Sequence, residues 1–598
     1  MKKKNVFKII SISLPFLLIL MIELILRLSG YGENYQLFKT LKIKDRPEYL
    51  VMNSEVSKKY FNNEGFNSDN QSDIFLKTKT DSTFRVFVQG ASTVVGFPYY
   101  RGGSFPRMLK HRLSQTFPNK NIEIINTGIT AVNSYTLWDL TDEIIEQKPD
   151  LVLFYAGHNE YYGALGVGSS SSIGSHPIIV RSYLFLKKFR FFQLLDNSYS
   201  KIFSKKTKTP KVGETNLMEV MAKEQRIPYN SEVYEAGINQ FENNLDKILN
   251  TYKKYNIPVI ISTIVSNEKD IKPFISDSIN NEKKFLKNLE ENNIEANKVA
   301  KNNALAAYKL GRHYLKKNQD TAKKHLHIAK ELDYLRFRAP ERINDVISNL
   351  SKKHNFPLID MKKAFISHSP DDIIGNELLT EHLHPNIEGY FIMADAFYNK
   401  IKELNYLKNW SNYIPYSEAF EDIPTTDIDS IKGKLIIADL KKSWPYVMNM
   451  SGSLPKSTYY DITNPTYEEK KAMSIYMNQP QWKNVMIEAY ETYKRTKKYS
   501  KALRIAQSLI FEYPEQADGY LEAGTICLKM EDPKRAVYYF IKYNQLDKTS
   551  ASAKQLAKVY MTLNKLNLAQ KTIFEAKKSG LKDTDLDNLL QNITDRIN

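Results

Sequence analysis

The chain has 598 residues, too many for one hydrophobic core, and its length predicts about three domains. Apolar residues make up 42% of it, which is ample for folded domains. The formal net charge is +18, but the lysines are spread along the chain and no nucleic-acid-binding motif accompanies them, so we expect no nucleic acid partner.

An apolar stretch at 9–26 follows four lysines that lie within the first eight residues. Its 18 residues are just enough to cross a bilayer. The charge placement keeps the lysines inside and predicts that everything after Arg27 is exported. No small-residue cleavage site follows, which favours an uncleaved signal anchor over a cleaved signal peptide. We therefore expect residues 1–30 to form a cytoplasmic tip and a membrane-spanning helix, with the rest in the periplasm or at the cell surface.

Three apolar runs, at 84–88, 122–125 and 151–155, predict buried strands. Each run is followed by a short polar or glycine-containing turn. The carboxyl ends of parallel strands share one edge of an open α/β sheet, and such folds build their sites at that edge. The residues that we expect there are Ser92, Gly128, His158, Asn159 and Glu160.

A fourth strand is predicted at 257–265, ending beside Ser266 and Asn267 at the same edge of the sheet. Between the third and fourth strands lies an insertion, 163–230, which opens with a glycine- and serine-rich run at 166–172. Two interpretations of this insertion stay open: a lid over the site, or a plain surface loop.

A second insertion, at about 291–350, has the apolar spacing of a helical hairpin and resembles a lone tetratricopeptide-type hairpin. Arg336 and Arg338 follow its second helix. Because arginine binds carboxylates and phosphates through two parallel hydrogen bonds, this pair is a candidate grip for an acidic substrate. The alternative is an interdomain salt-bridge pair.

The block at 381–385 reads Glu-His-Leu-His-Pro. A serine hydroxyl is a weak nucleophile, so it needs a positioned base and donors for the oxyanion that forms when it attacks. His384 is the candidate base, whereas His382 is expected to be an ordinary loop residue. Ser92 alone would commonly be turn chemistry or a helix cap, and the whole ordered set is what favours catalysis.

This order of blocks resembles the SGNH (GDSL-like) hydrolase family, in a membrane-anchored subgroup with C-terminal tetratricopeptide repeats. The resemblance implies a flavodoxin-like, three-layer α/β domain at 31–407. It makes Ser92 the nucleophile, His384 the general base and Glu381 its orienting carboxylate. The implied oxyanion donors are the N–H groups of Ser92 and Gly128 and the side-chain amide of Asn159. His158, Asn267, Arg336 and Arg338 are candidate substrate contacts.

Two residues depart from the family pattern. Ala91 stands where the family has an aspartate between glycine and serine, and Glu381 replaces the aspartate three residues before the histidine. A glutamate can still orient an imidazole, as Ser-His-Glu triads show. The chemistry needs no metal and no cofactor, and no Cys, His and carboxylate cluster has metal-ligand spacing.

The last part of the chain has a 34-residue period, carried by Ala489, Ala523 and Ala557 and repeated by Ala502 and Ala536. This spacing is typical of tetratricopeptide repeats, which we expect at 481–598 as an all-α array. Such arrays bind proteins in a concave face; the alternative is that this one only buttresses the hydrolase domain. A connector at 408–480 contains a possible strand at 434–438. Cys527, the single cysteine, is expected to be a buried apolar residue and excludes an intramolecular disulfide.

We therefore expect an extracytoplasmic serine esterase that acts on an acylated substrate, and the substrate that we expect is an O-acyl group of an envelope glycan. Two other functions stay open. The same triad serves an O-acyltransferase when a sugar hydroxyl replaces water, and Glu381 together with the repeats is also compatible with a catalytically silent binding protein.

Overall fold

The computed structural model describes residues 3–44, 46–61, 73–170, 172–173, 176–203, 217–291, 294–447, 464–477 and 481–597. Its centre is a five-stranded parallel sheet with the order β5-β4-β6-β7-β8. The strands are β4 (Thr83–Gly90), β5 (Asn121–Asn126), β6 (Leu151–Tyr155), β7 (Val259–Ser262) and β8 (Leu358–Ile359). Counted from β4, this is the 2-1-3-4-5 order of the flavodoxin-like fold. The predicted fold class is confirmed.

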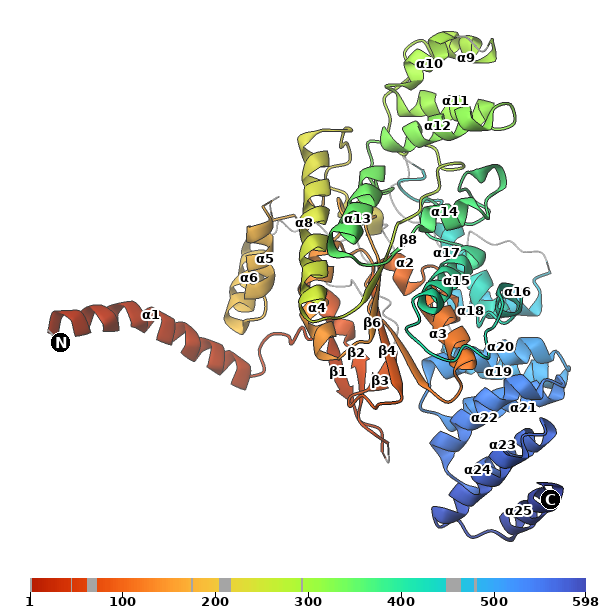
Figure 1. Cartoon of the computed structure of the whole chain (residues 1–598). Helices are drawn as coiled ribbons and strands as arrows, with labels where there is room; N and C mark the ends of the chain where they lie inside the picture. The colour runs from red at the N-terminus through yellow and green to blue at the C-terminus, as the bar shows by residue number, and fades with distance from the viewer. Residues whose placement is uncertain are drawn as a thin grey trace.

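Helices cover both faces of this sheet, giving three layers (Figure 1). One face carries α4 (Ser134–Glu146), α8 (Glu232–Lys254) and α13 (Glu341–His354), and the other carries α3 (Phe105–Thr116) and α15 (Ile387–Glu403). Every residue of β4 and β6 is buried, as their nearly continuous apolar runs require. The fourth strand, β7, is shorter than the predicted 257–265.

A small antiparallel sheet, which the sequence analysis did not predict, lies beside β4 and β5. It consists of β1 (Phe38–Leu41), β2 (Tyr49–Met52) and β3 (Ile74–Leu76). Phe38 and Phe75 pack edge to face against each other, 5.1 Å between ring centroids. Arg85 joins the two sheets, since it donates to the Leu76 carbonyl (2.5 Å) and pairs with Glu123 (2.7 Å).

Both predicted insertions are helical. The first contains α5 (Pro177–Leu186), α6 (Arg190–Phe203) and α7 (Leu217–Met221). Helices α9 (Glu282–Glu290), α10 (Ile294–Ala300), α11 (Ala304–Tyr314) and α12 (Gln319–Glu331) form the second, with a small apolar core of their own. Helix α13 begins inside the predicted range 291–350 and ends beyond it. It packs against α8 and β7, so it belongs to the central layers.

The C-terminal part is an all-α array, as predicted. Its helices are α19 (Trp482–Arg495), α20 (Tyr499–Glu512), α21 (Ala517–Lys529), α22 (Pro533–Asp547), α23 (Ser550–Thr562), α24 (Leu566–Lys578) and α25 (Thr584–Ile597). The five periodic alanines are fully buried where helices pack together. Arg107 of α3 pairs with Glu512 of α20, and Arg101 lies over the Trp482 ring (4.3 Å), so the array is docked on the α/β domain.

The connector differs from its prediction in one element. Residues 434–438 are not a strand but part of helix α17 (Asp427–Leu440). Thr426 caps this helix by accepting the Asp429 N–H, and Ile428 and Leu435 are buried in the core of the array. Helix α18 (Tyr467–Tyr476) shares that core, so packing of the array begins before residue 481.

The N-terminal helix, α1 (Lys3–Leu28), projects from the body of the protein (Figure 1). Its segment Ser11–Leu28 is long and apolar enough to cross a membrane, and almost none of it is buried inside the protein. By these criteria it is a candidate membrane anchor or signal sequence.

Candidate active site

Ser92 begins the short helix α2 (Ser92–Val95), directly after the end of β4. The turn needs a glycine at position 90, because a Cβ there would lie 2.3 Å from the Tyr155 carbonyl oxygen and 2.2 Å from Val94. Ser92 is in the first turn of α2, where backbone N–H groups have no partner within a helix. It stands between β4 and β6, at the point where the strand order of the sheet reverses.

The His384 imidazole, from the C-terminal part of the α/β domain, contacts the Ser92 side chain. Its Nε2 lies 2.7 Å from the Ser92 Oγ, although the two residues are 292 positions apart. The turn that carries it is pinned, since Thr380 donates its backbone N–H to the His384 carbonyl (2.8 Å) and Asn386 caps α15. The ring also packs against Phe97, 4.7 Å between centroids.

Glu381 holds the opposite nitrogen of this imidazole. Its Oε1 lies 2.6 Å from His384 Nδ1 and also accepts the His384 backbone N–H (2.6 Å). An ionised carboxylate only accepts hydrogen bonds, so Nδ1 carries the proton and Nε2 is left as the acceptor for the Ser92 hydroxyl. The longer glutamate therefore still meets Nδ1, and the Glu381 side chain is fully buried.

Tyr446, which was not predicted from the sequence, contacts the second oxygen of the Glu381 carboxylate. The Tyr446 hydroxyl donates to Glu381 Oε2 (2.8 Å) and lies 2.8 Å from His382 Nδ1. His382 itself contacts Glu381 Oε2 and packs against the Phe274 and Phe337 rings, so it is buried rather than an ordinary loop residue. The only local signal for Tyr446 is the Trp-Pro-Tyr sequence at 444–446, which is not specific.

Burial lowers the pKa values of three histidines at the site. It lowers the pKa of His384 to about 3 and holds the pKa of His382 well below its usual range. The pKa of His158 is lowered to about 3, first by burial and then by the neighbouring charges of His384 and Lys330. All three imidazoles are therefore neutral at neutral pH, the form in which His384 accepts a proton.

The three expected oxyanion donors lie at the ends of β4, β5 and β6. The Gly128 N–H donates to Asn126 Oδ1 (2.9 Å), and a Cβ at this glycine would lie 2.9 Å from the Val95 nitrogen. Asn159 donates one amide hydrogen to the Val132 carbonyl (3.1 Å), which fixes its side chain and leaves a second amide hydrogen. In this arrangement Gly128 already has an acceptor, whereas Asn159 retains a donor.

Four other sequence candidates have protein partners. His158 accepts the Ala339 N–H at Nδ1 (3.4 Å), and Asn267 is fully buried and donates its side-chain amide to the Glu381 carbonyl (3.2 Å).

Arg336 and Arg338 are buried too. Arg336 donates to the Ile227 and Glu331 carbonyls. Arg338 donates to the Asn267 and Ile271 carbonyls and to the Asp333 carboxylate (3.0 Å). These bonds tie both arginines to the loops behind the site, while Arg336 Nη2 and Arg338 Nε are buried without a hydrogen-bond partner among the described residues, so the substrate grip stays a prediction. Glu160 is likewise buried, bonded to Ser134 and Gln240.

One cluster has the residue types of a metal site. Glu268, His327 and Glu341 bring possible ligand atoms within 4.8 Å of one another. Two ammonium groups already neutralise the carboxylates: Lys330 lies 3.2 Å from Glu268 and 3.0 Å from Glu341, and Lys362 lies 2.7 Å from Glu341. The donor set therefore fits an ion-pair network better than a divalent cation.

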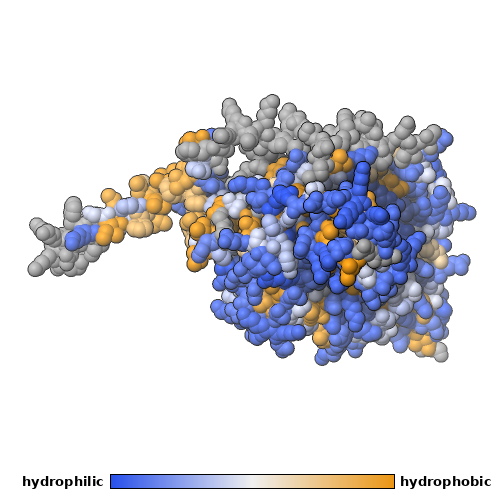
Figure 2. All heavy atoms as spheres, turned by 90° about the horizontal axis from the view of Figure 1, so that it is seen from above, coloured by the Kyte–Doolittle hydropathy of each residue, from blue (hydrophilic) through white to orange (hydrophobic). Residues whose placement is uncertain are grey.

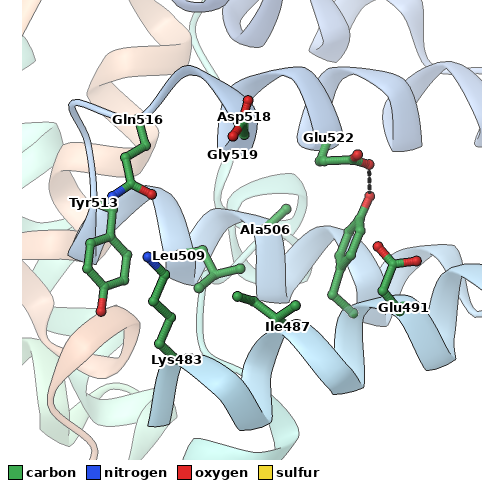
Figure 3. A pocket seen from close by; sticks show the side chains of 11 residues that line it. Lys483, Ile487, Glu491, Ala506, Leu509, Tyr513, Gln516, Asp518, Gly519 and Glu522 are labelled. Carbon is green, nitrogen blue, oxygen red and sulfur yellow. Dashed lines mark hydrogen bonds between the residues drawn. The ribbon is translucent and has the colours of Figure 1, made fainter. Parts of the chain in front are cut away.

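A cavity of about 300 Å³ lies away from these residues, in the helical array (Figure 3). Helices α19, α20 and α21 line it, and Ile487, Ala506 and Leu509 form its apolar floor. Lys483 lies at one end, its ammonium 4.1 Å from the Tyr513 ring centroid, and Glu522 accepts the Tyr490 hydroxyl at the other.

No protein-family model matches the chain, and neither does any curated protein. Solved structures to which it is similar include a lipase/acylhydrolase from Enterococcus faecalis, with 13% identity, a TM-score of 0.25 and coverage of 54% of this chain and 96% of that one. A GDSL-like lipase from Bacteroides thetaiotaomicron has 11% identity and a TM-score of 0.27, with coverage of 55% of this chain and 93% of that one. An acetylxylan esterase from Geobacillus stearothermophilus has 13% identity and a TM-score of 0.27, with coverage of 56% of this chain and 98% of that one.

Proposed function

We propose that this protein is a serine esterase of the SGNH type. The observation that carries the proposal is one continuous chain of hydrogen bonds, from Ser92 Oγ through both nitrogens of His384 to Glu381, with lengths of 2.7 Å and 2.6 Å. A nucleophile, a base and an orienting carboxylate in this order are what acyl transfer to a hydroxyl needs.

In this mechanism Ser92 Oγ attacks the ester carbonyl carbon as its proton moves to His384 Nε2. Glu381 stabilises the imidazolium that forms, without taking its proton. The oxyanion is stabilised by the Ser92 N–H and by the second amide hydrogen of Asn159, with Gly128 contributing when its N–H turns from Asn126. The imidazolium then protonates the leaving alcohol, and a water molecule that His384 activates releases the acid and frees Ser92.

The substrate that we propose is an O-acyl group on an envelope glycan. Helix α1 supports this setting, because four lysines precede its apolar segment and would keep the N-terminus in the cytoplasm and the catalytic domain outside. A protein anchored in this way faces the polymers of the envelope, while the triad requires an ester.

Hydrolysis of aryl acetates and labelling with a fluorophosphonate probe test the proposal together. The wild-type chain is expected to hydrolyse the ester and to be labelled, whereas Ser92→Ala loses both and His384→Ala loses hydrolysis. Ser367→Ala and His368→Ala are matched controls, since these side chains are exposed, donate to the Ala364 carbonyl of α14 (Met361–Ile366) and lie outside the triad; the His368 ring also stacks on Tyr416. Turnover of purified Ser92→Ala at the wild-type rate would refute the mechanism.

We propose further that the array binds a protein partner at the cavity in Figure 3, whose apolar floor lies between a basic and an acidic end. A photo-crosslinking amino acid at Ile487, which lines the cavity, tests this in the intact cell envelope. Leu568 is the matched control, because it is exposed to the same degree (44%, against 45% for Ile487) but lies outside the cavity. A defined crosslinked product at 487 and none at 568 is the expected result.

A further inference from the structure

The hairpin of α5 and α6, in the first insertion, exposes an unusual amount of apolar surface. Within the described part of the chain, nine large apolar side chains between 173 and 202 are exposed, more than a soluble surface segment normally carries. They are Ile173, Ile178, Ile179, Phe185, Leu186, Phe189, Leu195, Tyr199 and Ile202.

These side chains form stripes along the two helices. On α5, Ile178, Ile179, Phe185 and Leu186 follow the i, i+1, i+7, i+8 spacing of one helix face, while Val180 and Leu184 on the opposite face are buried in the protein core. On α6, Leu195, Tyr199 and Ile202 follow the i, i+4, i+7 spacing. Each helix is therefore apolar on a side that no described part of the chain covers.

The hairpin is tied to the outer end of α1. Helix α1 packs against α6, and Glu23 of α1 accepts the Phe191 N–H at the start of α6 (2.8 Å). Arg27 pairs with Glu23 (2.7 Å) and donates to the Lys188 carbonyl (3.4 Å). Beyond the helix, Gln193 exchanges two hydrogen bonds with the backbone of Glu33.

These contacts fix the depth of the hairpin. Glu23 lies five residues before the end of α1 at Leu28, which is about 7.5 Å along a helix. Helices that lie in a membrane surface bury their apolar face about 5–10 Å into the boundary between headgroups and acyl chains. The start of α6 is therefore at interfacial depth if α1 crosses the bilayer.

The direction of the hairpin agrees with this depth. In Figure 1, α5 and α6 run crosswise to α1 and lie on the side of the body from which α1 projects. Figure 2 shows hydrophobic residues continuing from α1 onto the adjoining surface of the body. At ten residues, α5 is too short to cross a bilayer, but a helix crosswise to a membrane span lies along the membrane plane.

We propose that the α5–α6 hairpin is a second membrane contact, which rests its exposed apolar stripes in the outer surface of the bilayer that α1 spans. Lys188 and Lys201, exposed on the same hairpin, suit anionic headgroups. A single helix leaves a domain free to rotate about it, whereas a helix and a hairpin together hold the domain in one orientation. This inference rests on the proposed membrane anchor.

The test uses the full chain in vesicles of phosphatidylcholine and phosphatidylglycerol, with an environment-sensitive dye on an introduced cysteine. Ile179→Cys and Leu195→Cys report on the hairpin, Leu18→Cys on the span, and Phe574→Cys on an exposed site of the array. The unmodified chain is the labelling blank, because Cys527 is buried and burial raises its thiol pKa. Lipids that carry a nitroxide on the acyl chain quench only dyes that contact the bilayer.

Quenching of at least about twofold is expected at 179, 195 and 18, with none at 574. Quenching at 18 alone would overturn the hairpin proposal and leave the anchor standing. Shielding of 179 and 195 from aqueous iodide without quenching by lipid would show that a protein covers them, and would overturn it as well. No quenching at 18 would refute the anchor itself, while ester hydrolysis, measured on the same samples, reports separately on the triad.

Discussion

Ser92 and His384 are 292 residues apart in the chain and 2.7 Å apart in space, whereas the helices of the array pack mainly against their neighbours in sequence. The first arrangement depends on a whole sheet to bring two ends of a domain together. The second repeats one local contact, around alanines such as Ala489 and Ala523. We therefore expect changes at the site to remove chemistry and leave the fold intact, and changes in the array to affect stability without touching hydrolysis.

The largest effect is expected from Glu381→Gln. The amide would donate to His384 Nδ1, which moves the imidazole proton to Nε2 and leaves no acceptor for the Ser92 hydroxyl. We expect kcat to fall by about 10⁴, as with the equivalent change in a Ser-His-Asp triad. Glu377→Gln is the control, because Glu377 pairs with Lys269 (2.9 Å) rather than with the imidazole. A loss of less than about tenfold, in a variant with an unchanged circular dichroism spectrum, would contradict the assignment of Glu381.

Asn159→Ala comes next. If its second amide hydrogen stabilises the oxyanion, kcat should fall by about 10² to 10³, with little change in KM. Asn243→Ala removes a similar single bond to a backbone carbonyl at an exposed position of α8, so it separates the loss of an oxyanion donor from the loss of a local hydrogen bond. Equal kinetics for the two variants would remove Asn159 from the oxyanion hole.

The pH profile distinguishes a buried base from an exposed one. Because burial lowers the pKa of His384 to about 3, its neutral form persists far below the usual value of 6.5. At about pH 5, kcat/KM should therefore exceed by about 30-fold what an unshifted imidazole would allow. The folded state binds fewer protons than the unfolded chain, so unfolding free energy should decline as pH falls below about 6.5. An acid limb centred at 6.5 would contradict the burial of the base.

Tyr446→Phe should have a smaller effect, because it removes the donor to Glu381 Oε2 and leaves Oε1 on the imidazole. A loss of about tenfold in kcat with unchanged KM corresponds to one hydrogen bond to a charged group. Tyr413→Phe is the matched control, since that hydroxyl donates only a long bond (3.4 Å) on the surface. An equal change in KM would indicate a structural role instead of positioning of the carboxylate.

The sequence predicted the parts of this comparison that depend on local pattern. Continuous apolar runs located β4, β5 and β6, and the motif after the first of them located Ser92 at the edge of the sheet. His384 follows no strand closely, so the family resemblance alone paired it with Ser92, from whose Oγ its Nε2 lies 2.7 Å. Tyr446 was missed because nothing near it in the chain indicates that its hydroxyl meets Glu381, 65 positions away. Only the folded arrangement of the connector creates that contact.

Tertiary contacts account for one error and for one open prediction. Residues 434–438 are apolar enough for a strand, but the Thr426 cap and the contacts of Ile428 and Leu435 with the array make them helical. Arg336 and Arg338 have the chemistry to bind an anion, yet most of their hydrogen bonds go to backbone carbonyls of distant loops. Residue type gives the chemistry that is possible, and tertiary contacts decide whether it is directed to a ligand or to the protein.

The smallest effect on catalysis is expected from Ala523→Leu. Ala523 is fully buried between packed helices, so the larger side chain should cost the array about 1–3 kcal/mol of unfolding free energy. Hydrolysis of a short aryl ester should change by less than about twofold, since no described residue of the array hydrogen-bonds to Ser92, His384 or Glu381. Leu528→Ala, at a partly exposed position on the same helix, should alter stability by less than about 0.5 kcal/mol. A loss of hydrolysis in Ala523→Leu that tracks its loss of stability would show instead that the docked array, through contacts such as Arg107 with Glu512, holds the hydrolase-like domain in its active form.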